Sequence, residues 1–161
     1  MPVIHDVFKN KKVLGLIPAR GGSKRLPRKN LRQINGKPLI YWSIVEPQES
    51  EYIDSVVVST EDIEIKQYSY NQGIDCVIDR PPSLAQDESR SIDVVLHAVD
   101  VLAQQGKKYE YTHYDAVFGM PVQSYVIKYK GKQLGLEFRK SGDLGSVLEK
   151  IYQSFSLTEI I

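Results

Sequence analysis

The sequence is poor in cysteine, since Cys76 is its single thiol among 161 residues. One thiol excludes an internal disulfide framework and a cysteine-based zinc site, and it favours a reducing compartment. Apolar runs are also short. None approaches the roughly 20 residues that a membrane span needs, and residues 1–12 lack the apolar core of a signal peptide. We therefore expect a cytoplasmic protein with no membrane partner.

A long stretch near the start of the chain has no acidic residue. Between Val7 and Val45 there are ten Lys or Arg residues and not one Asp or Glu, although the formal net charge is only +1. This asymmetry points to an anionic ligand, either phosphate on a small molecule or the backbone of a nucleic acid. A solvated basic face is the plainer alternative, and charge alone does not decide between them.

The residues that are present suffice for one folded domain spanning residues 1–161. An apolar content of 42% and a charged content of 25% are ordinary for a soluble globular protein. Short apolar runs alternate with amphipathic segments, which predicts a mainly parallel sheet with helices on both faces. The expected strands cover residues 12–19, 54–60, 75–78 and 114–120.

The expected helix ends follow from proline, glycine and hydroxyl side chains. The first helix is expected to run from Pro38 to Pro47, the second from Ser59 or Thr60 to Gly73, and the third from Ser91 to Gly106. Beyond residue 120 the pattern changes to two strands over 124–130 and 132–139, which form an antiparallel hairpin around Gly131, and a terminal helix over 144–155.

The first strand runs into a loop, RGGSKRLPRKN at residues 20–30, that has the chemistry of a phosphate-binding site. It lies at the carboxyl end of a parallel strand, where open α/β sheets bind their ligands. Gly21 and Gly22 allow the backbone to approach an anion closely. Five cationic side chains surround them: Arg20, Lys24, Arg25, Arg28 and Lys29. The spacing matches neither the P-loop nor the GxGxxG fingerprint.

Four motifs in order resemble the acylneuraminate cytidylyltransferase (CMP-sialic acid synthetase) family. They are LIPARGGSKRLPRKNL at 16–31 with NGKPLI at 35–40, VVVST at 56–60, RPPSLA at 80–85 and DESRSIDVVLH at 87–97. The resemblance covers a core of residues 12–115. Lys29 and Asn30 favour the sialic-acid branch over the related 3-deoxy-manno-octulosonate branch.

This resemblance implies a Rossmann-like nucleotidyltransferase sheet and an enzyme that transfers CMP from CTP to a nonulosonic (sialic-acid-like) sugar acid with release of pyrophosphate. Arg20 and Lys29 would be the catalytic charge stabilisers. The residues that would bind the nucleotide are Gly21, Gly22, Ser23, Lys24, Asn30, Arg80 and Ser91. Some of these residues have a plainer interpretation: Ser91 would be a helix N-cap, and Arg80 would pair with Asp79 or Asp87 at the surface. The neighbouring loop cations Arg25 and Arg28 would be solvated.

Residues 116–161 do not follow the family pattern. The family implies Mg²⁺, but the paired aspartates that would bind it are absent after Asp115, which leaves Asp62 and Asp115 as candidate ligands. Two hypotheses stay open: an active synthetase, for which the family allows a homodimer, or a non-catalytic or truncated module that binds CTP. A nucleic-acid partner is not favoured, because the cations lie in a glycine loop rather than along a helix.

Overall fold

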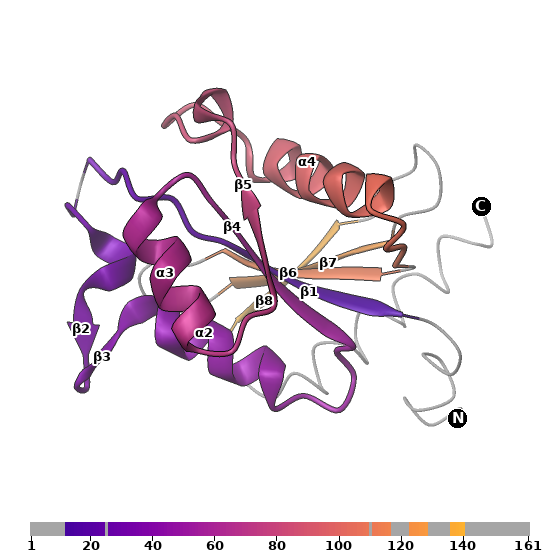
Figure 1. The fold of residues 1–161 in the computed structure, drawn as a ribbon, viewed down its shortest axis with the longest axis horizontal. Coiled ribbons are helices and arrows are strands. Elements are labelled where there is room, and N and C mark those ends of the chain that lie inside the picture. Colours follow the sequence, from indigo (N-terminus) through magenta and orange to yellow (C-terminus); the bar gives the residue numbers. More distant parts are fainter. Residues whose placement is uncertain (1–11, 25, 110, 117–122, 129–135, 141–161) are drawn as a thin grey trace.

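A computed structural model of the chain describes residues 12–24, 26–109, 111–116, 123–128 and 136–140 (Figure 1). The expected terminal helix over residues 144–155 and the expected turn at Gly131 lie outside the described residues, as does Arg25. Among the helices in these ranges, none is long and apolar enough to cross a membrane.

The main sheet has the order β5-β4-β1-β6-β7-β8. The first four of these strands run parallel, and β7 and β8 continue the sheet in antiparallel pairing. Their bounds are β1 Val13–Pro18, β4 Ser55–Thr60, β5 Cys76–Asp79, β6 Tyr111–Ala116, β7 Gln123–Lys128 and β8 Leu136–Lys140. The expected mainly parallel sheet with an antiparallel addition is confirmed. β6 begins three residues before its predicted start because Tyr111 already pairs with both Val13 and Lys128.

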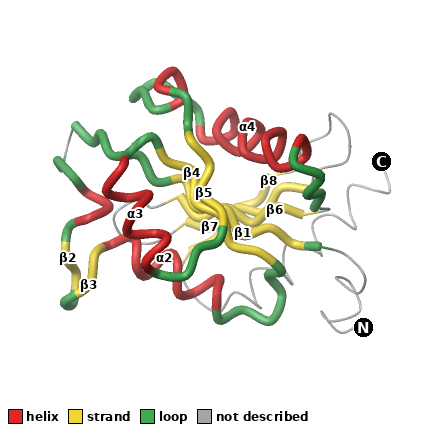
Figure 2. Tube along the Cα trace, in the orientation of Figure 1, coloured by secondary structure: helices red, strands yellow, loops and turns green. Residues whose placement is uncertain are grey.

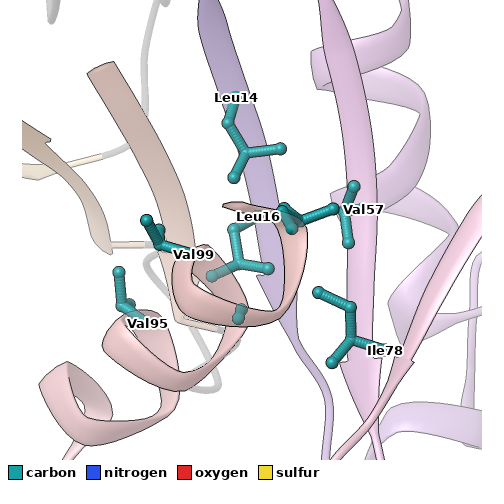
Figure 3. Close-up of a cluster of buried hydrophobic side chains, with 8 residues drawn as sticks. Leu14, Leu16, Val57, Ile78, Val95 and Val99 are labelled. Atoms are coloured by element: carbon teal, nitrogen blue, oxygen red, sulfur yellow. The ribbon is translucent and has the colours of Figure 1, made fainter. Parts of the chain in front are cut away.

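Helices cover both faces of the sheet. Helix α4 (Ser91–Gln104) lies on one side, and α2 (Leu39–Gln48) and α3 (Ile63–Asn71) lie on the other (Figure 1). Leu14 and Leu16 of β1 point toward α4 and pack against Val95 and Val99 (Figure 3). Ile17 points the opposite way and joins a second core with residues of α2 and α3. The period-two alternation of side chains along a buried strand therefore supplies both cores.

A two-stranded hairpin stands apart from the main sheet (Figure 2). Its strands, β2 (Gln33–Ile34) and β3 (Lys37–Pro38), pair antiparallel around Asn35 and Gly36. Both turn residues have positive φ, 52° and 75°, as two-residue hairpin turns require. The Asn-Gly pair is a strong hairpin signal, yet the sequence analysis used it only as part of a family motif.

Two expected helix caps are wrong. Asp62, rather than Ser59 or Thr60, caps α3, and its side chain accepts the amides of Glu64 and Ile65. The strand continues through Thr60, whose hydroxyl instead accepts the Asp62 amide at 3.1 Å. Helix α4 likewise begins after Arg90, which makes no side-chain cap, so Ser91 is its first helical residue.

The other expected helix ends agree closely with the structure. Pro38 precedes α2, and that helix ends at Gln48, one residue beyond Pro47. A proline in the last turn removes only one hydrogen bond, so the turn is completed. Gly73 and Gly106 follow α3 and α4 with φ of 82° and 78°, the left-handed conformation in which glycine commonly ends helices.

Candidate functional site

A cleft of about 220 Å³ opens at the carboxyl ends of β1, β4 and β5. Its walls are the glycine-containing loop after β1, the short 3-10 turn η1 (Lys29–Leu31), the loop after β5 with its turn η2 (Pro82–Leu84), and the start of α4. Six of the nine predicted site residues line it: Arg20, Ser23, Lys29, Asn30, Arg80 and Ser91. Parallel strands place the ends of sequence-distant segments at one sheet edge, which explains their convergence.

Arg80 is a buried cation in this cleft. Its side chain leaves the residue only 6% exposed, and its guanidinium donates to the carbonyl oxygen of Ser59 at 2.6 Å and to the Ser59 hydroxyl at 3.3 Å. Burial lowers the Arg80 pKa to about 10, with Glu61 favouring and Arg20 opposing the charge. The expected alternative of surface pairing with Asp79 or Asp87 is wrong, because those carboxylates bind Lys66 and the cations of the glycine loop.

Lys29 and Asn30 enter the cleft from the turn η1. Burial, with a further contribution from nearby Arg20, lowers the pKa of Lys29 below its ordinary value of 10.5. Asn30 is 7% exposed, and its amide nitrogen donates to the Arg20 carbonyl at 2.8 Å. Its side-chain oxygen is buried and accepts no hydrogen bond within the described part of the chain. A buried acceptor of this kind needs a donor, and a ligand in the cleft can supply one.

Acidic side chains bind two cations and one backbone amide of the glycine loop. Asp87 binds Arg20 at 2.9 Å and Lys24 at 2.7 Å, and these hydrogen bonds, led by the one from Lys24, hold the Asp87 pKa below its usual range. Glu61 accepts the Gly21 amide at 2.7 Å. Asp87 therefore neutralises part of the positive charge that Arg20 and Lys24 bring to the loop.

The remaining predicted residues lie beside the cleft. Gly22 and Lys24, together with Ser23, line a contiguous groove against residues 85–88. Gly21 lines neither space, and its amide donates to Glu61 rather than pointing into the cleft. Arg28, expected to be solvated, binds Asp62 and also Glu64 at 2.9 Å.

A family model described as "Cytidylyltransferase" matches residues 14–106, which include every element that lines the cleft. The chain belongs to the cytidylyltransferase family.

Individual members of the family show how far the similarity extends. A pseudaminic acid cytidylyltransferase of Campylobacter jejuni is 41% identical over 100 residues, which are 62% of this chain and 43% of that protein. A CMP-N,N'-diacetyllegionaminic acid synthase of Legionella pneumophila is 41% identical over 91 residues, 56% of this chain and 38% of that protein. The matched segment therefore spans less than half the length of these relatives.

Solved structures agree on the fold. A CMP:2-keto-3-deoxy-manno-octonic acid synthetase complexed with CTP superposes with a TM-score of 0.52 at 27% identity, over 64% of this chain and 39% of that one. A 4-diphosphocytidyl-2C-methyl-D-erythritol synthase reaches 0.51 over 88% and 86% of the two chains, but at 13% identity that likeness concerns the fold alone.

One side of the cytidylyltransferase cleft was not predicted from the sequence. Gln86, Asp87 and Ser89 line the cleft, and Glu61 accepts the Gly21 amide beside it, yet none of the four was predicted. A usable signal existed for these residues, because each follows the carboxyl end of a parallel strand and should therefore face the glycine loop. Asp87 was considered as a surface partner of Arg80, and Glu61 was given no role in the site.

A preformed Mg²⁺ site does not fit the described residues. No group of three or more His, Cys, Asp or Glu side chains in these ranges could hold a metal ion. Asp62, which the sequence analysis offered as a ligand, directs its oxygens at Arg28 and at the amides that begin α3. The side chain of Asp115 lies outside the described residues.

Proposed function

We propose that this chain binds CTP in the cleft and that the protein transfers CMP to a nonulosonic, sialic-acid-like sugar acid. In this reaction a sugar hydroxyl loses its proton to solvent and its oxygen bonds to the α-phosphorus of CTP, the bond from that phosphorus to the oxygen bridging the α- and β-phosphates breaks, and pyrophosphate leaves. The observation that carries the proposal is a cleft whose buried polar groups lack ligands. Arg80 has only the two neutral Ser59 oxygens as hydrogen-bond partners in the described ranges, and the Asn30 oxygen has none.

Each side of the cleft has a distinct task in this proposal. Arg20, Lys24 and Lys29 neutralise the triphosphate, which gains charge on its leaving oxygens as the bond breaks. Arg80, Asn30 and Ser91 line the cleft with hydrogen-bonding groups that orient the nucleoside. Positioning and charge neutralisation are the main demands of phosphoryl-type transfer, so the protein needs no covalent intermediate. We expect Mg²⁺ to accompany the triphosphate, with ligands outside the described set.

Nucleotide choice tests the proposal. CTP should outcompete ATP, GTP and UTP, because the relatives are named for cytidylyl transfer and the buried groups of Arg80 and Asn30 present a defined set of donors and acceptors in the cleft. Isothermal titration calorimetry with each nucleotide, with and without Mg²⁺, measures this preference. Equal affinity for all four nucleotides would show that the site binds any triphosphate and would contradict the proposed selectivity for CTP.

The second candidate function is CTP binding without turnover. It is favoured by the lack of a metal-binding cluster among the described residues, because a metal ion contributes several kcal/mol to transition states of this kind. A coupled pyrophosphate assay with CTP and sialic, legionaminic or pseudaminic acid separates the two candidates. Mg²⁺-dependent release of pyrophosphate supports the synthetase, and CTP binding without release supports the module.

Alkaline pH should weaken CTP binding through Lys29. In the free protein burial and Arg20 keep the Lys29 pKa below 10.5, and the negative charge of a bound triphosphate raises it. Protonated Lys29 binds CTP better, so affinity is highest below the free-protein pKa and falls as pH rises from there toward the higher pKa of the complex. The fall is at most about tenfold per pH unit.

Calorimetry in buffers of different ionisation enthalpy should therefore detect proton uptake on CTP binding at alkaline pH. The triphosphate itself is already ionised there, since the second pKa of a phosphate group is about 6. The matched variant Lys29→Arg keeps its charge throughout this range and should show a smaller uptake. Identical uptake in the two proteins would assign the titration to another group.

A further inference from the structure

Arg28 holds a backbone conformation that arginine rarely adopts. Its φ of 56° and ψ of 32° lie in the left-handed region, where residues other than glycine, asparagine and aspartate need support from the surrounding structure. Arg28 comes directly before the turn η1 and makes no side-chain cap of its own. Its backbone therefore sets the direction in which Lys29 and Asn30 leave the loop.

The support for Arg28 comes from Asp62. The carboxylate of Asp62 accepts both terminal nitrogens of the Arg28 guanidinium, with Nη2 at 3.2 Å from Oδ1. The same carboxylate accepts the amides of Glu64 and Ile65 at 3.0 Å each. Although burial opposes ionisation of Asp62, the hydrogen bonds from Arg28 and these amides outweigh it, and the Asp62 pKa lies below its usual range. Asp62 thus fastens the loop to the rigid start of α3.

Gly21 makes room for this contact. A Cβ atom at Gly21 would lie 2.2 Å from Oδ2 of Asp62 and 2.7 Å from its Cβ and Cγ atoms, which no real side chain tolerates. The other end of the segment is tied by the bond from Asn30 to the Arg20 carbonyl. Asp62 therefore sits between the beginning and the end of the phosphate loop.

We propose that Asp62 is a positioning residue for nucleotide binding, which holds Arg28 in its left-handed conformation and so directs Lys29 and Asn30 into the cleft. Asp62 does not line the cleft and acts through Arg28. The proposal deepens the proposed function and rests on it. It also gives Gly21 a second role, which is to accommodate the Asp62 side chain.

The decisive variant is Asp62→Asn. Asparagine is as good an N-cap as aspartate, so α3 keeps its start, while Arg28 loses a charged, two-oxygen partner. We expect the Kd for CTP to rise roughly three- to tenfold, with helix content and melting temperature close to those of the parent chain. The control is Lys66→Gln, which removes the 2.6 Å ion pair of the same helix with Asp79 and should leave the Kd unchanged.

A second variant and a double-mutant cycle separate positioning from general stability. Arg28→Ala leaves the Asp62 cap intact, removes the anchor and places at position 28 a residue that disfavours the left-handed conformation, so it should raise the Kd to a similar degree. If Asp62 acts through Lys29, Asp62→Asn should change the Kd less than about twofold in a Lys29→Ala background. An undiminished effect there would overturn the route through Lys29.

The outcomes also separate this proposal from the proposed function. Unchanged CTP affinity in both Asp62→Asn and Arg28→Ala, in a chain that binds CTP, would overturn the positioning role alone. Failure of the unmodified chain to bind CTP would instead overturn the proposed function.

Discussion

Replacing Arg80 with methionine is expected to weaken CTP binding by about 2–5 kcal/mol, the effect of truncating one partner of a buried, hydrogen-bonded charge contact. The residue is 6% exposed and lines the cleft. Its stability effect should be small by comparison. The guanidinium donates only to the two neutral oxygens of Ser59 in the described ranges, so removing the buried cation also removes a desolvation cost. We expect the free energy of unfolding to change by no more than about 1 kcal/mol.

Calorimetry with CTP and urea unfolding measure the two quantities for Arg80→Met. Arg90→Met is the matched control, because Arg90 follows the same loop, is exposed and pairs with Asp93 at 2.8 Å outside the cleft. It should leave the CTP affinity unchanged. A large loss of stability in Arg80→Met with retained CTP affinity would make Arg80 a structural residue and would remove it from the site.

Replacing Lys29 with alanine is expected to weaken CTP binding by about 1.5–3 kcal/mol, the strength of a hydrogen bond to a charged group. The free-protein pKa of Lys29 is depressed by burial first and by Arg20 second, so a bound phosphate relieves an unfavourable charge environment in addition to forming a contact. High salt should reduce this loss of binding free energy less than it would for an exposed cation, because partly buried charge pairs are screened less by salt.

Titration calorimetry on Lys29→Ala checks this second expectation. Lys37→Ala is its control, since Lys37 belongs to the same basic third of the chain but lies on β3, 5.0 Å from the centre of the Tyr41 ring. Equal losses in the two variants would show that the basic segment attracts CTP by net charge alone and that Lys29 has no specific place in the cleft.

Much of the site could be predicted because it follows from local patterns. The alternation of short apolar strands with amphipathic helices identified β1, β4 and β5 to within a residue or two, and the rule that ligands bind at the carboxyl ends of parallel strands located the cleft. Arg20 and Lys29 were predicted from the loop sequence and Asn30 from the family resemblance, and all three line the cleft. The predicted cap of α3 was wrong because the hydroxyl of Thr60 and the carboxylate of Asp62, two residues later, both satisfy the pattern for a cap.

The sequence by itself determined the order of the elements, the two-faced parallel sheet and the basic loop, because these depend on periods of two to four residues and on the chemistry of neighbours. Only the tertiary structure decided which polar and charged groups contact each other. Gly21 and Glu61 are 40 residues apart, and Arg28 and Asp62 are 34 apart. Such contacts depend on how β1 and β4 align and on where α3 begins, and no local pattern encodes either. The burial of Arg80 was decided in the same way, because Ser59, whose oxygens accept its hydrogen bonds, is 21 residues away at the end of β4.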